Sequence, residues 1–470
     1  MTEHYDVVIV GGGVVGAGVF RDAALHGLKC LLIDKKDFSS QTSQSSSKML
    51  HGGIRYLETF DFDLVYEALH EKNFWLKTTP HLCQEKSFVL PVYNDSLRPL
   101  LMLKAGMWLY DFLSGFKNHP HKMISKSETI SQFPQLRAQG LKGAGVYSDA
   151  IVDDAKLTLE VIYDAKLEND CEALNYHAMT DIKVSNERHT LEIKDELTGK
   201  TKTISCDDVV FALGPFTDKV LINIPELKWR PKLLPSKGSH IWIDPKKLNI
   251  KSPLVMTPKD GRVIFVIPQK DAVLVGTTEL EIEGDFFDLK ITQYEINYLL
   301  ENLNEYFPNA ELTEEDIFSS YAGVRPLIKD EDSSELGKTA RYHKCYWPRS
   351  NVHVLMGGKY TTFRTMAQDV AENLCAKRRI SYSKDRTKWP MRQKSVLSPF
   401  QVHTTTRNQL EEILINESAR TFEDLVVRRM GIPGRKHWQD DQEFNEFFLN
   451  NLELINLYFP VTPEEIKNFQ

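Results

Sequence analysis

The sequence predicts an α/β fold with three parts: a discontinuous parallel-sheet domain, a second domain built around an antiparallel sheet, and a short C-terminal helical cap. A β-branched run at residues 7–10 leads into a glycine-rich turn and then a helical pattern. The same order of apolar strand and glycine returns near residues 214 and 357. Between these pieces, residues 225–324 contain stretches of alternating polarity, which are typical of an antiparallel sheet with one solvated face.

Length and composition indicate a globular protein. The 470 residues allow two or three domains, and 65 acidic against 58 basic residues give a net charge of −7, which argues against nucleic acid as a partner. Six scattered cysteines without a C-x-x-C pair predict a reducing compartment and no metal site. Because we find neither a signal-peptide layout nor an apolar run long enough to cross a bilayer, we expect a cytoplasmic protein.

The first strand, turn and helix have the order of a Rossmann-like dinucleotide-binding unit. Residues 11–18 contain the pattern G-x-G-x-x-G, and the helical pattern continues to about His26. Gly11 permits the tight turn, Gly13 lets the backbone approach a pyrophosphate, and Gly16 lets helix and strand pack closely. The free N–H groups of the helix N-terminus would face that anion.

A second apolar strand, at residues 30–33, ends in Asp34. An acidic residue at this position accepts hydrogen bonds from the ribose hydroxyls and repels the extra phosphate of NADP. Asp34 therefore predicts a ligand with an unphosphorylated ribose.

The segment after this strand favours FAD over NAD. Residues 39–47 carry seven hydroxyl side chains in nine positions. A flexible linker is the alternative interpretation. We favour a loop that lines the phosphates and the flavin, because the apolar, glycine-containing residues 49–57 follow at once and buried cofactor atoms need polar partners. The side chains predicted at the cofactor are those of Thr42, Ser43, Ser46, Ser47 and Lys48.

The remaining pattern predicts how the chain divides. A helical pattern at residues 154–164 and a buried strand at residues 207–212 supply further parts of the nucleotide domain. We predict an FAD-binding domain from residues 1–85, 142–224 and 325–390, a substrate domain from residues 86–141 and 225–324, and a C-terminal helical domain from residues 391–470.

Residues 99–113 form a helical pattern that is apolar nearly all round. Only Lys104 and Asp111, seven positions apart, form a narrow polar stripe. Such a helix is either buried in the protein core or lies in a membrane interface.

Several longer motifs resemble the membrane-associated, FAD-dependent glycerol-3-phosphate dehydrogenases. They occur in family order, and several are more specific than the dinucleotide pattern. Beyond residues 11–18, the matching stretches are residues 45–48, 51–57, 147–149, 152–155, 237–240, 260–262, 276–279, 321–327 and 357–364.

Three features depart from the family pattern. Residues 212–216 read A-L-G-P-F in place of the usual A-T-G-P-W, and Tyr360 replaces a leucine. Neither change removes a glycine or a charge. The region after Pro390 is shorter than the family's C-terminal helical domain, which affects expectations about assembly and membrane docking rather than chemistry.

The resemblance implies oxidation of sn-glycerol 3-phosphate to dihydroxyacetone phosphate, with hydride transfer to FAD. A buried phosphate needs cations, and cationic or polar candidates for substrate binding are Arg55, Tyr56, Arg262, Arg325 and Lys359. His51 and His240 are the candidate bases, and Arg325 would polarise the alkoxide or the product carbonyl. The alternative roles are that His51 only contacts the flavin and that His240 only positions the substrate. The further candidates for cofactor binding are Gly214, Gly358, Lys359, Thr361 and Thr362.

The resemblance further implies a membrane quinone as electron acceptor, peripheral contact with the cytoplasmic face of the inner membrane, and a homodimer as a possible assembly. Two enzymatic alternatives remain: a glycerol-3-phosphate oxidase that uses oxygen, and an amine-oxidising enzyme of the glycine-oxidase type. A non-catalytic flavin-binding protein is the alternative from another class. The predicted cations argue against it.

Overall fold

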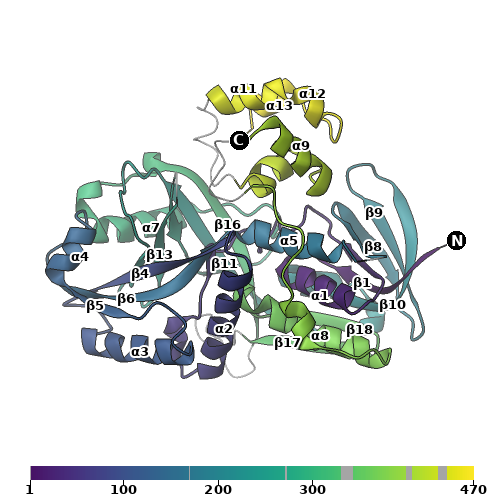
Figure 1. The fold of residues 1–470 in the computed structure, drawn as a ribbon, viewed down its shortest axis with the longest axis horizontal. Coiled ribbons are helices and arrows are strands. Elements are labelled where there is room, and N and C mark those ends of the chain that lie inside the picture. Colours follow the sequence, from purple (N-terminus) through teal and green to yellow (C-terminus); the bar gives the residue numbers. More distant parts are fainter. Residues whose placement is uncertain are drawn as a thin grey trace.

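The computed structural model describes residues 2–168, 170–269, 272–329, 342–397, 405–431 and 442–469. Two large sheets lie side by side, and a group of C-terminal helices lies over the helix α5 at the top of the view (Figure 1). The α/β fold class is thereby confirmed. Parts of the ranges 225–324, 325–390 and 391–470 lie outside the described residues, and the domain boundaries stay predictions.

The first sheet has a parallel centre. Its order is β18-β10-β1-β2-β7, the edge strand β17 pairs antiparallel with β18, and β8 and β9 form an antiparallel extension beside β10. The strands are β1 (Glu3–Val10), β2 (Cys30–Ile33), β7 (Glu172–Leu174), β8 (His177–Lys183), β9 (His189–Asp195), β10 (Thr201–Phe211), β17 (His343–Arg349) and β18 (Val352–Gly357).

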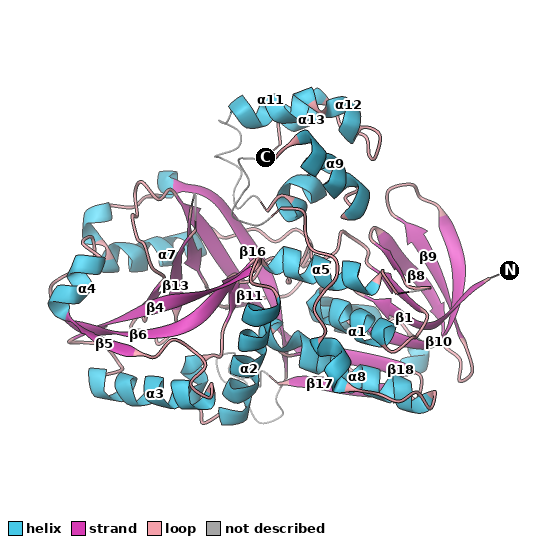
Figure 2. Ribbon diagram, viewed as in Figure 1, coloured by secondary structure: helices cyan, strands magenta, loops and turns pink. Residues whose placement is uncertain are grey.

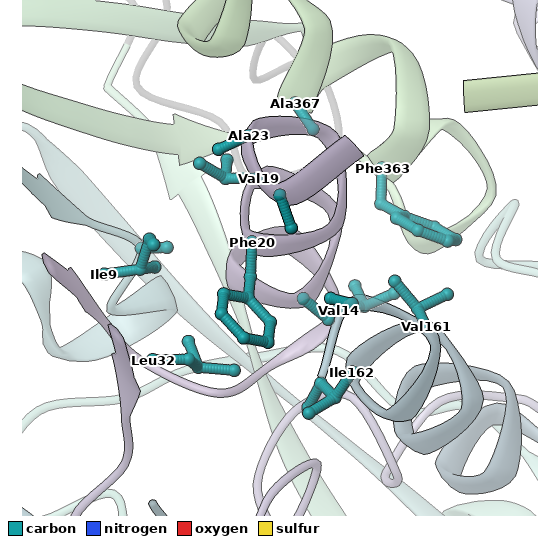
Figure 3. Close-up of a cluster of buried hydrophobic side chains, with 14 of the residues drawn as sticks. Ile9, Val14, Val19, Phe20, Ala23, Leu32, Val161, Ile162, Phe363 and Ala367 are labelled. Carbon is teal, nitrogen blue, oxygen red and sulfur yellow. The ribbon is translucent and has the colours of Figure 1, made fainter. Parts of the chain in front are cut away.

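Helices α1 (Val14–Leu25), α5 (Asp154–Ala165) and α8 (Phe363–Lys377) cover one face of this sheet. In Figure 3, Phe20 of α1 lies between Ile9 and Leu32 of the strands and Ile162 of α5. The opposite face packs against apolar side chains of β8 and β9. Both faces are therefore dry, which is the physical reason that residues 7–10 are continuously apolar.

The second sheet is mainly antiparallel (Figure 2). It contains β3 (Met49–Leu50), β4 (Cys83–Tyr93), β5 (Lys122–Ser125), β6 (Leu141–Val152), β11 (Leu233–Ile243), β12 (Leu254–Met256), β13 (Ile264–Pro268), β14 (Val273–Gly276), β15 (Leu280–Glu281) and β16 (Ile317–Ile328). Strand β6 pairs along its whole length with β4 in this sheet, although most of β6 falls in the range predicted for the nucleotide domain.

The expected solvated face of this sheet is wrong for β11, β13 and β14, whose residues are mostly buried on both sides. Helix α7 (Gln293–Tyr306) packs into the cluster on one face. Helix α3 (Leu100–Leu113) and residues of α2 (Phe62–Thr78) pack into the cluster on the other. Alternating polarity here reflects buried polar groups near a site rather than contact with water.

Helix α3 is neither fully buried nor fully exposed. Met107 and Tyr110 face the core, whereas Leu101 is 80% and Trp108 55% exposed. Asp111 is also buried and pairs with His121, so it shares no polar stripe with the exposed Lys104. Among the residues that the structure describes, no helix is long and apolar enough to span a membrane.

The C-terminal helices have an apolar cluster of their own. They are α9 (Arg407–Asn416), a π-helical segment (Asp424–Arg429), α11 (Gln442–Asn450), α12 (Leu452–Ile455) and α13 (Pro463–Lys467). The remaining short elements are the helices α4 (Lys126–Gln132) and α6 (Thr217–Leu221) and the 3-10 turns Ile54–Leu57, Gly214–Phe216, Pro225–Leu227, Pro308–Ala310, Glu314–Asp316, Tyr360–Thr362 and Lys384–Lys388.

Candidate active site

The turn between β1 and α1 leaves no room for side chains. A Cβ atom at Gly16 would lie 1.9 Å from the carbonyl oxygen of Gly11, and one at Gly11 would lie 2.4 Å from that of Ala212. Gly11 also has a φ of +113°, which L side chains rarely adopt. Helix α1 therefore begins directly above the strand ends, with its N-terminus at a cavity.

Asp34 lies at the end of β2, beside this turn. Its carboxylate accepts hydrogen bonds from the backbone N–H groups of Gly12 (2.6 Å) and Lys36 (2.8 Å). Burial raises the pKa of Asp34 to about 6 despite these bonds. Each carboxylate oxygen has further acceptor capacity. The role of Asp34 at a ribose stays a prediction.

A cavity of about 660 Å³ extends from the glycine turn into the region between the two sheets. It brings together most of the predicted site residues: Gly11, Gly13, Asp34, Thr42, Ser43, Ser46, Ser47, His51, Tyr56, Gly214, His240, Arg325, Gly358, Lys359 and Thr361. The glycine turn, the acidic residue Asp34 and a cavity whose lining includes many hydroxyl side chains fit a dinucleotide such as FAD.

Five predicted residues do not line this cavity. Gly16 contacts the backbone of Gly11, and Lys48 pairs with the buried Asp154 at 2.7 Å. Thr362 lies in the turn before α8, where its Oγ1 is 3.5 Å from the carbonyl oxygen of Lys359. These three residues contact or directly follow residues of the lining, and so support the cavity wall without forming part of its surface.

The other two residues outside the lining are cations. Arg262 has its Nε 3.7 Å from Asp260 and its guanidinium over the ring of Tyr298, a residue of α7. Arg55 is half-buried in the 3-10 turn Ile54–Leu57. The structure thus brings two of the four predicted cations, Arg325 and Lys359, to the cavity surface.

The hydroxyl-rich segment is an ordered wall and not a linker. Ser43 Oγ accepts a hydrogen bond from the N–H of Val14 at the start of α1 (2.9 Å). Thr42 donates to the carbonyl oxygen of Val324 (2.8 Å), and Ser46 donates to Asp154 (2.7 Å). These bonds join the hydroxyl-rich segment to the three elements α1, β16 and α5.

Arg325 and Lys359 are the predicted cations at the cavity surface, which Lys35 and Lys219 also line. One Arg325 nitrogen donates to Thr277 Oγ1 (2.8 Å) and to the carbonyl oxygen of Thr278 (3.2 Å). The Lys359 ammonium lies 3.9 Å from the centre of the Tyr56 ring. An anion bound beside Arg325 would therefore meet a cation that the chain already holds by hydrogen bonds.

His240 is buried at the centre of this region, with 3% of its surface exposed. Its Nε2 shares a hydrogen bond with Ser47 Oγ (2.9 Å), its ring stacks on Tyr321, and its Nδ1 has no hydrogen-bond partner among the described residues. Burial, followed by the charges of Arg325 and Lys48, lowers the pKa of His240 to about 3. The imidazole is therefore neutral near pH 7, and in the ligand-free protein it is a weak base.

His51 also lines the cavity, on the turn that leads to Tyr56. Its backbone N–H lies 3.3 Å from Thr361 Oγ1. The next residue, Gly52, donates its N–H to the buried Asp149 (3.3 Å), which also accepts a bond from Tyr110 of α3 (2.7 Å). Asp149, from one of the matched motifs, thus supports the turn that carries His51.

Sequence reasoning missed Glu295, the buried carboxylate behind Arg325. Glu295 accepts hydrogen bonds from Lys237 Nζ, Ser239 Oγ and Thr278 Oγ1, each at 2.7 Å. Thr278 in turn holds Arg325, and Ser239 precedes His240. The capping-box position of Glu295, three residues after Thr292, was a visible signal for a helix start but not for this role.

This fold and this site together define an FAD-dependent oxidoreductase. The model of the FAD dependent oxidoreductase family matches residues 6–372. An aerobic glycerol-3-phosphate dehydrogenase of Staphylococcus haemolyticus is 36% identical over 380 residues, which are 80% of this chain and 68% of that one. One from Staphylococcus aureus is 36% identical over 376 residues, with coverages of 79% and 67%.

The chain belongs to the FAD-dependent oxidoreductases and, within them, to the family of the aerobic glycerol-3-phosphate dehydrogenases, as its motifs predicted. The solved glycerol-3-phosphate dehydrogenase of Bacillus halodurans, complexed with FAD, has a TM-score of 0.75 at 22% identity and covers 99% of this chain and 94% of its own. Glycine oxidase of Geobacillus kaustophilus has a TM-score of 0.60 at 20% identity, with coverages of 83% and 100%. At these identities the solved structures show a common fold.

His240 makes the stability of the cofactor-free protein depend on pH. Its pKa is lower in the folded chain than the ordinary 6.5, so between pH 6.5 and about 3 only the unfolded state takes up a proton there. Stability is therefore lost as the pH falls, by roughly 1.4 kcal/mol per pH unit below pH 6. We expect His240→Gln to show a correspondingly weaker pH dependence in urea unfolding between pH 7 and 5. Equal slopes for the two proteins would contradict this.

Removal of the Glu295 charge should leave Lys237 buried without its counter-ion. We expect Glu295→Gln to lower the free energy of unfolding by about 3 kcal/mol. The double variant Lys237→Met/Glu295→Gln should recover most of this loss, because it removes the unpaired cation. Glu301→Gln, at an exposed position of the same helix, should change stability by less than about 0.5 kcal/mol. A double variant as unstable as the single one would argue against this charge pairing.

Proposed function

We propose that this protein oxidises sn-glycerol 3-phosphate at its secondary hydroxyl to dihydroxyacetone phosphate. The observation that carries this proposal is a dinucleotide cavity whose lining includes both the cations Arg325 and Lys359 and a neutral, buried His240. The names of the relatives that are 36% identical support the choice of substrate.

The residues of the glycine turn, Asp34 and the hydroxyl-rich wall would hold FAD. When bound, FAD supplies a ring that accepts the substrate's hydride. We assign phosphate binding to Lys359 and Arg325, with Tyr56 beside Lys359. Arg55 and Arg262 remain candidates that the cavity lining does not include. Charge-assisted hydrogen bonds from fixed cations would offset the cost of burying a phosphate.

We propose that His240 accepts the proton of the substrate's hydroxyl group. Its Nδ1 is buried and has no hydrogen-bond partner among the described residues. As the C–H bond breaks and its electron pair leaves as hydride, the O–H proton must leave too, and the carbonyl forms. The positive charge of Arg325 helps to lower the pKa of His240, so a phosphate that neutralises Arg325 would raise it. Substrate binding would then strengthen the base. His51 stays the second candidate.

Reduced flavin must pass its electrons on, and we propose a membrane quinone as the acceptor. The outer face of α3 supports peripheral contact with a membrane: Leu101 is 80%, Trp108 55% and Phe112 54% exposed. The Trp108 and Phe112 rings stack with centroids 5.8 Å apart, and exposed aromatic and aliphatic groups of this kind suit a membrane interface. We place this contact at the cytoplasmic face of the inner membrane. A homodimer stays a prediction.

Anaerobic addition of glycerol 3-phosphate should bleach the visible absorbance of the purified yellow protein. In a second experiment, we expect Lys359→Met to raise the KM for glycerol 3-phosphate by about tenfold to a hundredfold, because a charged hydrogen bond to the phosphate is lost. Lys344→Met, at an exposed position of β17, is the matched control and should leave KM unchanged. Bleaching by glycine instead would favour the amine-oxidising alternative, and stoichiometric peroxide in air without quinone reduction would favour the oxidase.

The membrane contact has a separate test. We expect Leu101→Glu/Trp108→Glu to lose binding to phospholipid vesicles in a flotation assay while keeping its bound flavin, since both side chains point away from the core. Leu197→Glu, which is also at an exposed apolar position (46%), should still float. Retained flotation of the α3 variant would refute α3 as the contact.

A further inference from the structure

Two consecutive arginines near the C-terminus, Arg428 and Arg429, are buried, although arginine side chains are usually exposed. The side chains of Arg428 and Arg429 are 2% and 0% exposed and lie at the end of the π-helical segment Asp424–Arg429. Both reach out of their own domain to one carboxylate, that of Asp37. Arg428 Nε lies 2.5 Å from Asp37 Oδ2, and Arg429 donates to Oδ1 at 2.8 Å as well as to Oδ2.

The surroundings of this cluster balance its charge. Asp424 accepts a hydrogen bond from Arg428 (2.5 Å), so two cations face two buried carboxylates. Asn175 donates to Asp37 at 2.8 Å. Burial alone would raise the pKa of Asp37, but the charges of Arg429 and Arg428 lower it to about 2. Asp37 is therefore held as an anion by a set of fixed donors.

Asp37 belongs to the loop that lines the cofactor cavity. The next side chain, Phe38, packs so closely on the glycine turn that a Cβ atom at Gly12 would lie 2.5 Å from its ring. Ser39 donates its N–H to the carbonyl oxygen of Gly12 (3.0 Å). The arginine pair is thus connected to the dinucleotide turn through two residues.

This loop needs external support. Residues 34–48 contain no helix or strand, yet Asp34, Lys35 and most of residues 39–47 line the cavity. Fixing the backbone of each residue in a loop costs conformational entropy. If contacts outside the cofactor hold the loop, FAD does not have to bear that cost on binding.

We propose that the C-terminal domain is part of the flavin site: Arg428 and Arg429 are positioning residues that hold Asp37 and thereby keep the loop of residues 34–48 in the shape that binds FAD. This proposal concerns FAD alone and does not depend on the identity of the substrate. It also differs from the expectation that a shortened C-terminal region leaves the chemistry untouched.

The test follows release of FAD from the holoprotein. After dilution, the recovery of free-flavin fluorescence gives the first-order release rate. We expect Asp37→Asn and Arg429→Lys each to speed release by about tenfold or more, because a neutral or non-planar partner cannot keep the fork of hydrogen bonds. With saturating FAD, KM for glycerol 3-phosphate should stay near that of the parent, because Asp37 does not line the cavity.

A matched control separates this role from general weakening of the C-terminal domain. Leu410→Ala removes a fully buried side chain from that domain's own apolar cluster and does not touch Asp37. We expect Leu410→Ala to lower the melting temperature of the apoprotein at least as much as Arg429→Lys does, with flavin release near the parental rate. Parental release rates in both Asp37→Asn and Arg429→Lys, or release from Leu410→Ala as fast as theirs, would overturn the proposal. Because Arg429→Lys keeps the buried charge, it remains a test if Asp37→Asn does not fold.

Discussion

The close packing of α1 on the ends of the parallel strands is the constraint on which the rest of this structure depends. It requires that no atom occupy the space between Gly16 and the carbonyl oxygen of Gly11, where a Cβ would lie at 1.9 Å. This approach directs the N-terminus of α1 into the cavity. The hydroxyl-rich segment of residues 39–47 lies against this helix start, where Ser43 Oγ accepts a hydrogen bond from the first N–H of α1. Residues far along the chain then complete the site around it.

The electrostatics of the cavity link its two ends. Arg325 is held by Thr277 and Thr278, and Thr278 is held by Glu295. Burial, and after it the same guanidinium charge that would attract a phosphate, lowers the pKa of His240 and keeps it neutral. A bound anion would therefore offset the charge of Arg325 and thereby raise the pKa of His240. The buried carboxylate of Glu295 supports this arrangement without facing the cavity, because its charge is compensated by Lys237.

Supporting elements outside the cavity connect it to other surfaces of the protein. Helix α3 presents Leu101 and Trp108 to solvent, while its Tyr110 reaches Asp149 and, through it, the turn that carries His51. On the other side, the segment Asp424–Arg429 reaches the loop of residues 34–48 through a buried cluster of two arginines and two aspartates. In both cases a peripheral element holds one wall of the site by buried hydrogen bonds to a carboxylate.

The sequence by itself determined the nucleotide-binding half of the fold, because its signals are local. A dry parallel strand needs consecutive apolar residues, the turn needs glycine at fixed spacing, and Asp34 must follow the second strand directly. The motifs also predicted the family, and most predicted site residues do meet in one cavity. Only the tertiary structure decided which cations reach that cavity, that α7 and α3 cover both faces of the second sheet, and that Arg429 meets Asp37 across 392 positions. Such contacts leave no periodic or spacing signal in the chain, since each depends on where whole domains pack.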